Sequence, residues 1–327
     1  MYICILDAEG NTLLHRNMAT KREVFLKVIA PYKENIVVAV ECMFTWYWIA
    51  DLCIENDIPF VLGHALYMKA IHGGKAKNDK IDSHKIAVLL RGGMIPVSYV
   101  YPAKMRATRD LLRRRNHLMR KRAELYAHIQ NTRHQYNLDE PLGRIAKPQN
   151  RDGIAERFQE PSVQKNIEVD LAMIEAYDQI LIPLEREIIK TAKQHDPVAY
   201  ALLKTIPGVG RILGLIILYE IEDIKRFPRV QDFVSYSRLV KSAKESNGKR
   251  YGSSGKKIGN AHLKWAFSEA AVLFLKGNDA GKKYLQKLTN KHGKGKALSI
   301  LAHKLGRATY YMLKNKTAFD QKKFLGQ

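Results

Sequence analysis

The 327-residue sequence contains little cysteine, little acidic charge and no long hydrophobic run. Its three cysteines, Cys4, Cys42 and Cys53, lie in apolar segments, and so small and odd a set argues against a disulfide framework or a zinc site. We expect them to be small core residues. No run reaches the roughly 18 apolar residues of a membrane span, and the first residues lack a secretory signal pattern. The sequence therefore predicts a cytoplasmic protein without a membrane partner.

The shortage of acidic residues is the strongest feature of the composition. The chain has 55 Lys and Arg against 32 Asp and Glu, a formal net charge of +23. Such a balance predicts a polyanionic partner, with nucleic acid favoured over an acidic membrane surface. Because 46% of the residues are hydrophobic, the composition is otherwise that of a globular protein, and the length allows more than one domain.

The N-terminal hundred residues carry strand patterns. Residues 2–6 and 12–18 flank the turn-forming segment 7–11 and predict a β-hairpin. Two further strands are expected at 36–40 and 58–62, and the first of these has the β-branched run of a strand that is buried on both faces. This part of the chain is therefore expected to be α/β.

Three carboxylates lie at the ends of these elements. Glu41 follows the strand at 36–40, at the end where functional groups gather in open α/β sheets. Asp79 and Asp82 stand three residues apart at the start of a predicted helix and therefore share a face. Carboxylates among lysines can hold Mg²⁺ against a phosphate backbone. The alternatives are helix capping for the two aspartates and an ordinary strand-end role for Glu41.

This order of carboxylates over strand, loop and helix suggests a metal nuclease core like that of ribonuclease H. Such cores place an aspartate in the middle of the first strand. Asp7, by contrast, falls in the predicted hairpin turn, where its side chain can bond its own backbone. Its assignment as a metal ligand is therefore doubtful.

A long basic helix is expected over residues 104–135, with leucines at heptad spacing and arginines on the rest of its surface. That surface suits a phosphate track, and the alternative is a solvated helix face. After a segment rich in Pro and Gly, an apolar stripe resumes over 164–193, so the two helices are expected to form an antiparallel pair or a dimer arm. The candidate phosphate contacts are Arg113, Arg114 and Arg115.

The segment Ile-Pro-Gly-Val-Gly at 206–210 joins two predicted apolar helices. It resembles a helix-hairpin-helix element, in which glycines let backbone N–H groups approach a phosphate at a helix N-terminus. The alternative is a tight corner between two helices with no ligand. The candidate nucleic-acid contacts here are Gly208, Gly210 and Arg211.

A stretch of Ser, Gly and basic residues over 244–257 is expected to form a loop. The hydroxyl of Ser246, set among cations, has the chemistry to attack a phosphodiester while the bases stabilise the developing charge. The alternatives are a plain phosphate-binding loop and a flexible connector. The candidate phosphate-binding bases are Lys249, Arg250, Lys256 and Lys257.

Taken together, these features resemble the DEDD insertion-sequence recombinases, the group that includes the RNA-guided bridge recombinases and the pilin-gene invertases. The resemblance spans nearly the whole chain. Its specific segments are V-x-V-E-C at 38–42, K-N-D-K-I-D at 77–82, I-P-G-V-G at 206–210 and E-S-x-G-K at 245–249.

The resemblance implies an architecture of α/β plus all-α type. Residues 1–102 would form a RuvC/ribonuclease-H-like domain with the DEDD acids, and 103–198 a long helical coiled-coil insertion. Residues 199–327 would form a helical C-terminal transposase domain with the helix-hairpin-helix-like element and the serine loop.

The resemblance also implies roles for individual residues. Glu41, Asp79 and Asp82 match the second, third and fourth acids, which would bind Mg²⁺, and Ser246 matches the serine nucleophile. The acids and the serine, from different subunits, would cleave DNA through a covalent phosphoserine link. The implied partners are DNA at the element ends and target, a structured guide RNA, and further copies of the chain in a dimer or tetramer.

The first acid of the family lies in mid-strand, whereas Asp7 matches the hairpin turn that follows the next strand. We therefore expect the chain to lack that first strand and its aspartate, to leave a sheet edge unpaired, and to cleave poorly.

The sequence thus predicts a site-specific DNA recombinase, or transposase, of an insertion sequence, guided by RNA. Two alternatives stay open. One is a RuvC-like structure-selective nuclease, in which water attacks and Ser246 only binds phosphate. The other is a truncated nucleic-acid-binding copy without catalysis.

Overall fold

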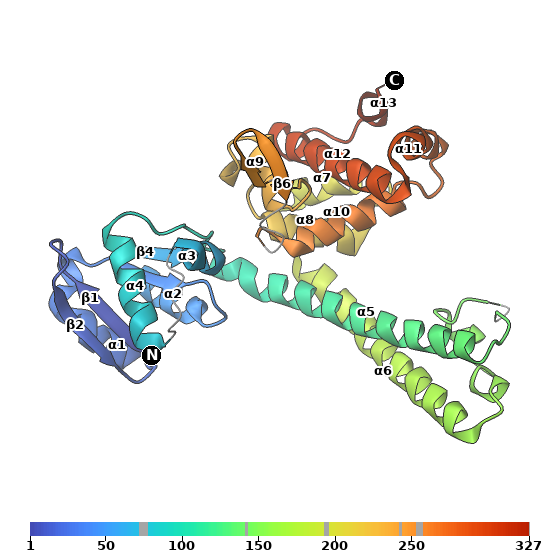
Figure 1. Cartoon of the computed structure of the whole chain (residues 1–327), viewed down its shortest axis with the longest axis horizontal. Coiled ribbons are helices and arrows are strands. Elements are labelled where there is room, and N and C mark those ends of the chain that lie inside the picture. Colours follow the sequence, from blue (N-terminus) through green and yellow to red (C-terminus); the bar gives the residue numbers. More distant parts are fainter. Residues whose placement is uncertain (72–77, 141–142, 193–195, 242–243, 253–257, 327) are drawn as a thin grey trace. The chain divides into compact units, whose positions relative to one another are not determined.

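The computed structural model describes residues 1–71, 78–140, 143–192, 196–241, 244–252 and 258–326. The chain divides into two compact units, Met1–Lys104 and Met105–Gln327, which we take in turn (Figure 1). Small sheets belong mainly to the first unit and helices dominate the second, so the fold is mixed. No helix in the described ranges is long and apolar enough to cross a membrane.

Two separate two-stranded sheets form the first unit, as far as the structure describes it. Strand β1 (Tyr2–Leu6) pairs antiparallel with β2 (Thr12–Asn17), which is the hairpin that the sequence predicts. Strand β3 (Val38–Glu41) pairs in parallel with β4 (Phe60–Gly63). Because β1 and β3 each have one hydrogen-bonded neighbour, each has one edge that no described strand covers.

Four helices pack on these strands: α1 (Arg22–Ile29), α2 (Trp46–Glu55), α3 (Ala65–Ile71) and α4 (Asp79–Arg91). Helix α4 contacts β1, β2 and β3, so it joins the two sheets into one body. A 3₁₀ turn over Ala30–Asn35 follows α1, because Pro31 lacks the N–H of a continuing α-helix. The largest apolar cluster of this unit contains Phe25, Ile29, Val38, Ile49, Leu52, Cys53 and Ile58.

The cysteine prediction is partly wrong. Cys53 is fully buried in the core and Cys4 is half-buried, but Cys42 is exposed. Cys42 follows Glu41 directly, in the bend where the chain leaves the sheet, so it lies outside the core. Among the described residues, none of the three cysteines forms a disulfide.

In the second unit, α5 (Ala103–Gln135) and α6 (Pro161–Ala192) run side by side (Figure 1). Three polar contacts cross between them, and their residue numbers rise on α5 as they fall on α6: Arg115–Glu185, Arg122–Asp178 and His128–Asp170. The two helices are therefore an antiparallel pair. Successive partners lie six to eight residues apart, about two helical turns, so the same faces stay in contact.

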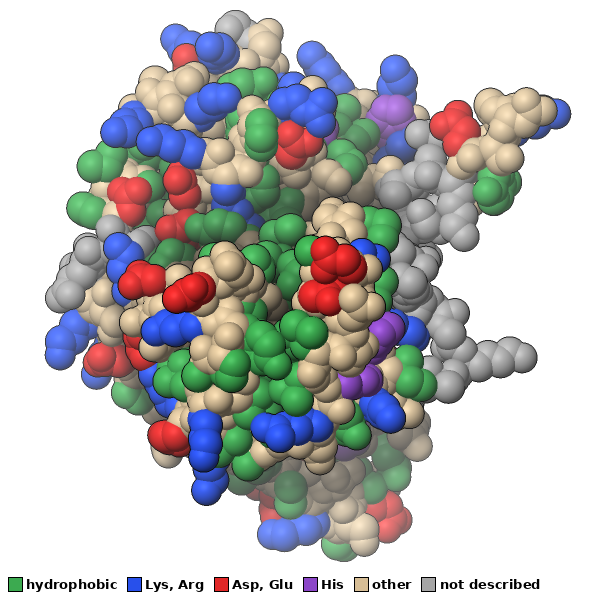
Figure 2. Space-filling view, turned by 90° about the vertical axis from the view of Figure 1, so that its left-hand side faces the viewer, with side chains coloured by type: hydrophobic (Ala, Val, Ile, Leu, Met, Phe, Trp, Pro, Cys, Tyr) green, Lys and Arg blue, Asp and Glu red, His purple; other side chains and the backbone are tan. Residues whose placement is uncertain are grey.

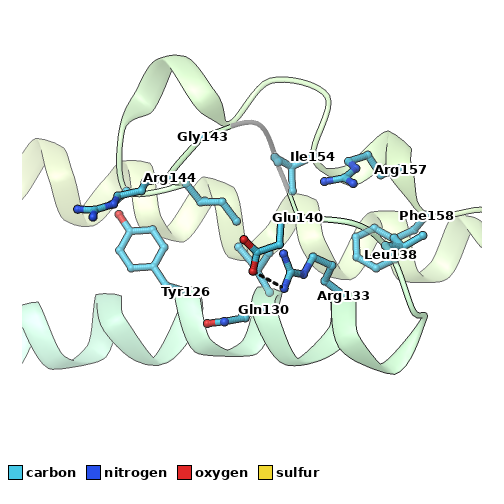
Figure 3. Close-up of a pocket in the computed structure, with 13 residues that line it drawn as sticks. Tyr126, Gln130, Arg133, Leu138, Glu140, Gly143, Arg144, Ile154, Arg157 and Phe158 are labelled. Atoms are coloured by element: carbon cyan, nitrogen blue, oxygen red, sulfur yellow. Dashed lines mark hydrogen bonds and ion pairs between the residues drawn. The ribbon is translucent and has the colours of Figure 1, made fainter.

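The far end of this pair has an apolar core of its own, built by Ile129, Ile154, Phe158 and Ile167 with their neighbours. A cavity of about 530 Å³ opens beside that core (Figure 3). Its wall includes the guanidinium of Arg133, which contacts Glu140 at 3.5 Å.

The rest of the second unit is a helical body around α8. Nine successive residues of α8, from Leu213 to Ile221, are buried, so α8 is the central helix. Helices α7, α10 and α6 pack against it. In chain order, the elements of this body are α7 (Pro197–Lys204), α8 (Arg211–Ile221), the 3₁₀ turn Ile224–Arg226, α9 (Val230–Tyr236), β5 (Lys244–Ser246), β6 (Lys249–Gly252), α10 (Ala261–Leu273), α11 (Asp279–His292), α12 (Lys294–Asn315) and α13 (Gln321–Leu325).

Large hydrophobic side chains are also exposed on the first unit. Figure 2 shows hydrophobic side chains gathered near the centre of the face that it displays, with basic side chains around them. The most exposed of the large ones is Phe44, at 91%.

Candidate functional site

Glu41 is the last residue of β3 and lies opposite Gly63 of β4 in the parallel register. The backbone turns directly after it, because the N–H of Met43 donates to the carbonyl of Glu41 at 2.7 Å. The side chain of Glu41 is half-buried. The structure therefore places this carboxylate at the carboxyl end of the parallel pair, where the sequence predicts it.

Asp79 and Asp82 lie in the first turn of α4, and Asp79 is exposed while Asp82 is half-buried. The N-cap is Asn78, whose side-chain oxygen accepts a hydrogen bond from the N–H of Ile81 at 2.8 Å. The capping hydrogen bond is thus supplied by another residue. Both aspartates still benefit from the helix dipole, but neither is needed as the cap.

The three carboxylates belong to one substructure, since α4 packs on the strand that carries Glu41. Over the described ranges, their side-chain oxygens make no hydrogen bond or ion pair with protein. Unpartnered carboxylates are the hard oxygen ligands that Mg²⁺ takes, so the donor types fit a divalent ion. However, no three His, Cys, Asp or Glu side chains converge on one metal position among the residues described.

Asp7 is engaged by the hairpin turn between β1 and β2. Its Oδ1 accepts hydrogen bonds from the N–H groups of Gly10 and Asn11, each at 2.7 Å, and its Oδ2 accepts one from the Asn11 side chain at 2.9 Å. These bonds, the Asn11 side chain first, lower the pKa of Asp7. Its carboxylate thus has a structural role that accounts for all of these contacts.

Phe44 and Met43 follow Glu41, and both are exposed, Phe44 almost completely. Helix α2 begins only at Trp46, so Phe44 lies in the preceding turn. An exposed ring of this kind is a surface on which a nucleobase can stack. The signal that could have found it is an aromatic residue between a strand end and a helix start.

The two glycines of the Pro-Gly-x-Gly turn have different roles. Gly208 has φ +86°, and a Cβ there would lie 2.5 Å from the backbone carbon of Leu273, so glycine is required for the turn to pack on the end of α10. Gly210 is the N-cap of α8, with no atom within 4 Å of an added Cβ. Gly208, Gly210 and Arg211 are all exposed, so both glycines of the turn are open to a ligand.

Ser246 lies at the tip of a β-hairpin, where the sequence predicts a loop. It ends β5 and pairs with Lys249 of β6 across Asn247 and Gly248. Both turn residues have positive φ, 49° and 71°, as a two-residue type I′ turn requires. Ser246 and Lys249 are exposed, so the hydroxyl is accessible beside a basic residue.

The other predicted bases of this stretch are less defined. The backbone of Arg250 lies in β6, opposite Glu245 in the hairpin register. Lys256 and Lys257 fall outside the residues that the structure describes.

The base of the hairpin segment is held by hydrogen bonds. The Nε of Arg238 donates to the carbonyls of Ile258 and Gly259, both at 2.9 Å. The N–H of Asn260 donates to the carbonyl of Tyr236 at 2.6 Å. The chain therefore leaves and re-enters the helical body at one fixed point, which anchors the segment that carries Ser246.

Asn260 connects this point to a buried carboxylate, Glu220 of α8. Its side-chain amide donates to Glu220 at 2.8 Å, and Arg109 and Arg113 of α5 reach the same carboxylate at 2.9 and 2.6 Å. The side chain of Glu220 is 3% exposed. Burial alone would raise the pKa of Glu220, but the bonds and charges of Arg113, Arg109 and Asn260 outweigh it and lower the pKa to about 2.

The predicted phosphate track on α5 is thus reduced by ion pairs within the protein. Arg113 is engaged by Glu220, and Arg115 contacts Glu185 of α6 at 2.5 Å. Arg114 is exposed and has no ion pair with a described residue. Of the three bases chosen from the sequence, Arg114 alone keeps its charge open to solvent.

Two family models match the chain. Residues 1–137, which contain the acids, match the DEDD transposase model of the IS110 group, and residues 200–286, which contain the Ser246 hairpin, match the model described as "Transposase IS116/IS110/IS902 family". The chain belongs to the IS110 family of transposases. The predicted resemblance is thereby confirmed, and the protein is a DNA transposase or recombinase.

A curated relative agrees with this assignment. The transposase is 22% identical to the "Transposase for insertion sequence element IS1111A" of Coxiella burnetii (strain RSA 493 / Nine Mile phase I). The similarity covers 92% of this chain and 83% of that protein. The DEDD family is generally metal-dependent.

Proposed function

We propose that this transposase cleaves and rejoins DNA at specific sites through a covalent bond between Ser246 and a DNA phosphate. The observation that carries the proposal is the hairpin tip, where the exposed Ser246 pairs with Lys249 across a two-residue turn. In the step, the Ser246 oxygen bonds to phosphorus, the bond from phosphorus to one DNA oxygen breaks, and that oxygen leaves with the electron pair. The serine proton passes to solvent, and the leaving oxygen takes a proton from solvent to become a hydroxyl. Reversal of these bonds on another DNA end rejoins the strand.

Glu41, Asp79 and Asp82 would hold the metal ion, with Mg²⁺ as the ion that suits all-oxygen ligands. When bound, the ion would neutralise phosphate charge at the cleaved bond. The support is that all three carboxylates lack hydrogen-bond and ion-pair partners among the described residues and lie on β3 and the helix packed against it. Acids at a strand end and at a helix start also suit a RuvC/ribonuclease-H-like fold for residues 1–102.

The wider assembly is part of the same proposal. Residues 103–198 would act as a coiled-coil-like arm and 199–327 as the transposase domain, in a cytoplasmic dimer or tetramer. The +23 charge supports DNA and a structured guide RNA as joint partners. Gly210, Arg211, Arg114 and Lys249, all exposed, would contact nucleic-acid phosphates.

The test is capture of the covalent intermediate. Wild-type protein is incubated with end-labelled element DNA that carries a nick near the cleavage site, so that rejoining is prevented, and adducts are resolved under denaturing conditions. We expect an adduct with wild type and with the control Ser268→Ala, and none with Ser246→Ala, while DNA binding stays unchanged. Cleavage by Ser246→Ala without an adduct would instead show that water attacks, as in a structure-selective nuclease.

Asp79→Asn and Asp82→Asn test the metal assignment. Each change should abolish cleavage and weaken Mg²⁺ binding measured by calorimetry. The melting temperature should change little, because Asn78 supplies the cap of α4. Retained cleavage with lowered stability would assign the aspartates to the helix terminus only.

A second candidate, a nucleic-acid-binding copy without catalysis, is favoured by the acids that do not converge in the described structure. It predicts salt-sensitive DNA binding by the wild type with neither adduct nor nicking.

A further inference from the structure

The C-terminal helices carry an unusual charge pattern. Residues 280–319 contain ten Lys or Arg and no Asp or Glu. This stretch covers α11 from its second residue and the whole of α12. The family match to the C-terminal part ends at residue 286, so most of the stretch lies beyond it.

Helix α11 is amphipathic. Tyr284 and Leu285 pack against the core of the second unit, which fixes the inward side of the helix. Lys283, Lys287 and Lys291 recur at four-residue spacing, so they share one side of the helix, and all three are exposed. The result is a stripe of ammonium groups along the solvent side of α11.

The stripe continues into the next helix. Helix α12 packs on α11 and begins after Gly293, where Lys294 and Lys296 are exposed. The start of this 22-residue helix has no side-chain cap, so its dipole adds positive potential near these lysines. We call the five residues Lys283, Lys287, Lys291, Lys294 and Lys296 the basic face.

The lysines of the basic face form no ion pairs with described residues. In the described part of the chain, none of its five lysines forms an ion pair or side-chain hydrogen bond, whereas neighbouring Lys282 pairs with Asp279 at 2.8 Å. Like charges four residues apart on a helix repel each other and destabilise it slightly. An external polyanion would remove that repulsion, so the charge pattern is complementary to a phosphate backbone.

We propose that the basic face binds the sugar–phosphate backbone of duplex DNA as an additional contact of the transposase. The lysine stripe rises about 6 Å per step and about 12 Å over its length, comparable with the roughly 12 Å width of the major groove. Lysines so spaced reach successive phosphates or the two backbones that border a groove. Such contacts position DNA without reading its sequence.

This inference rests on the DNA activity of the family and deepens the proposed function, but it uses no residue of the Ser246 hairpin and none of the acids. The test is a salt titration of binding to a short duplex of unrelated sequence. The variant Lys283→Gln/Lys287→Gln/Lys291→Gln should bind more weakly. The slope of log K against log salt should fall in magnitude by about 2.7, at ~0.9 for each of three phosphates.

A matched control removes the same charge elsewhere. Lys21, Lys27 and Lys33 in and beside α1 are exposed, and Lys21→Gln/Lys27→Gln/Lys33→Gln should leave the slope at its wild-type value. The triple arginine variant at positions 283, 287 and 291 should also keep the slope. Equal melting temperatures of all variants would establish that folding is intact.

The proposal is overturned if both glutamine triples lower the slope equally, because net charge would then explain the effect. It is also overturned if the α11 triple loses binding to an RNA hairpin but not to the DNA duplex. A wild-type slope for the α11 triple in a protein that still forms the Ser246 adduct would refute the basic face alone. A lowered slope without any adduct would support the basic face and refute the serine mechanism.

Discussion

Helix α5 and the basic face are both rich in basic residues, but they use them in different ways. On α5, Arg109 and Arg113 share a buried carboxylate, and Arg115 and Arg122 pair with acids of α6. On the basic face, none of the five lysines forms an ion pair with a described acid. The planar guanidinium suits bidentate pairs with carboxylates, whereas a hydrated ammonium group stays in solvent. Counting bases therefore does not identify those that contact nucleic acid.

The largest loss of stability is expected from substitution of Glu220. Glu220→Ala leaves Arg109 and Arg113 without their shared partner, and an uncompensated buried charge should lower the free energy of unfolding by about 3–5 kcal/mol. Urea unfolding followed by circular dichroism measures this. The control Glu168→Gln breaks an exposed pair with Lys165 and should change little. Equal effects of the two substitutions would remove the structural role that we assign to the α5 arginines.

Acid should weaken the same cluster. The pKa of Glu220 is lowered in the fold from 4.5 to about 2, so its stabilisation is fully present above pH 4.5 and is lost as pH falls toward 2. The shift corresponds to roughly 3 kcal/mol. Comparing urea unfolding of wild type and Glu220→Gln over this pH range isolates the group. The difference between them should shrink in acid, and a constant difference would contradict the assignment.

A smaller loss of stability is expected when an ion pair between α5 and α6 is broken. Asp178 accepts hydrogen bonds from Arg122 of α5 and from Arg151, at 2.5 Å for the latter, and all three side chains are largely buried. Asp178→Asn should lower the free energy of unfolding by about 1.5–3 kcal/mol, the range for hydrogen bonds to charged groups. Thermal unfolding would show it. DNA affinity unchanged at equal folding would confirm that these arginines are structural.

The smallest expected effect is on the salt dependence of DNA binding, and it distinguishes two neighbouring arginines of α5. Arg114→Gln should lower the salt slope of DNA binding by ~0.9 and leave the melting temperature unchanged, because Arg114 is exposed and lacks an ion pair with described residues. Arg115→Gln should leave the salt slope unchanged and lower the melting temperature, since it breaks the pair with Glu185. The comparison fails if both variants change the slope alike.

Much of the fold follows from sequence pattern. The β1–β2 hairpin and α5 match their expected bounds closely, because alternation and heptad spacing are local signals. Helix α9 begins only at Val230, since Pro228 and the capping contacts of Arg229 and Asp232 delay its start. The Ser246 hairpin was expected as a loop, although Asn247-Gly248 is the common signal for a two-residue turn.

The candidate site could be predicted only in part. Ser246, Glu41, Asp79 and Asp82 stand out because carboxylates and serines at element ends are visible in sequence. The pairing of Arg113 with Glu220 is not visible, because 107 residues separate the two partners. The available clue was Glu220 itself, a lone acid in the apolar run of α8, which burial would make costly without a positive partner.

The central claim is that the α5 arginines are structural and the lysines of the basic face bind DNA. Its most direct test is chemical footprinting with mass spectrometry, in the presence and absence of duplex DNA, using one reagent for lysine and another for arginine. We expect Lys283, Lys287 and Lys291 to react readily in free protein and to be protected by DNA. Arg109, whose side chain is 8% exposed, should stay unreactive in both states. Reactive Arg109 that DNA protects, together with α11 lysines that DNA leaves unchanged, would contradict the account.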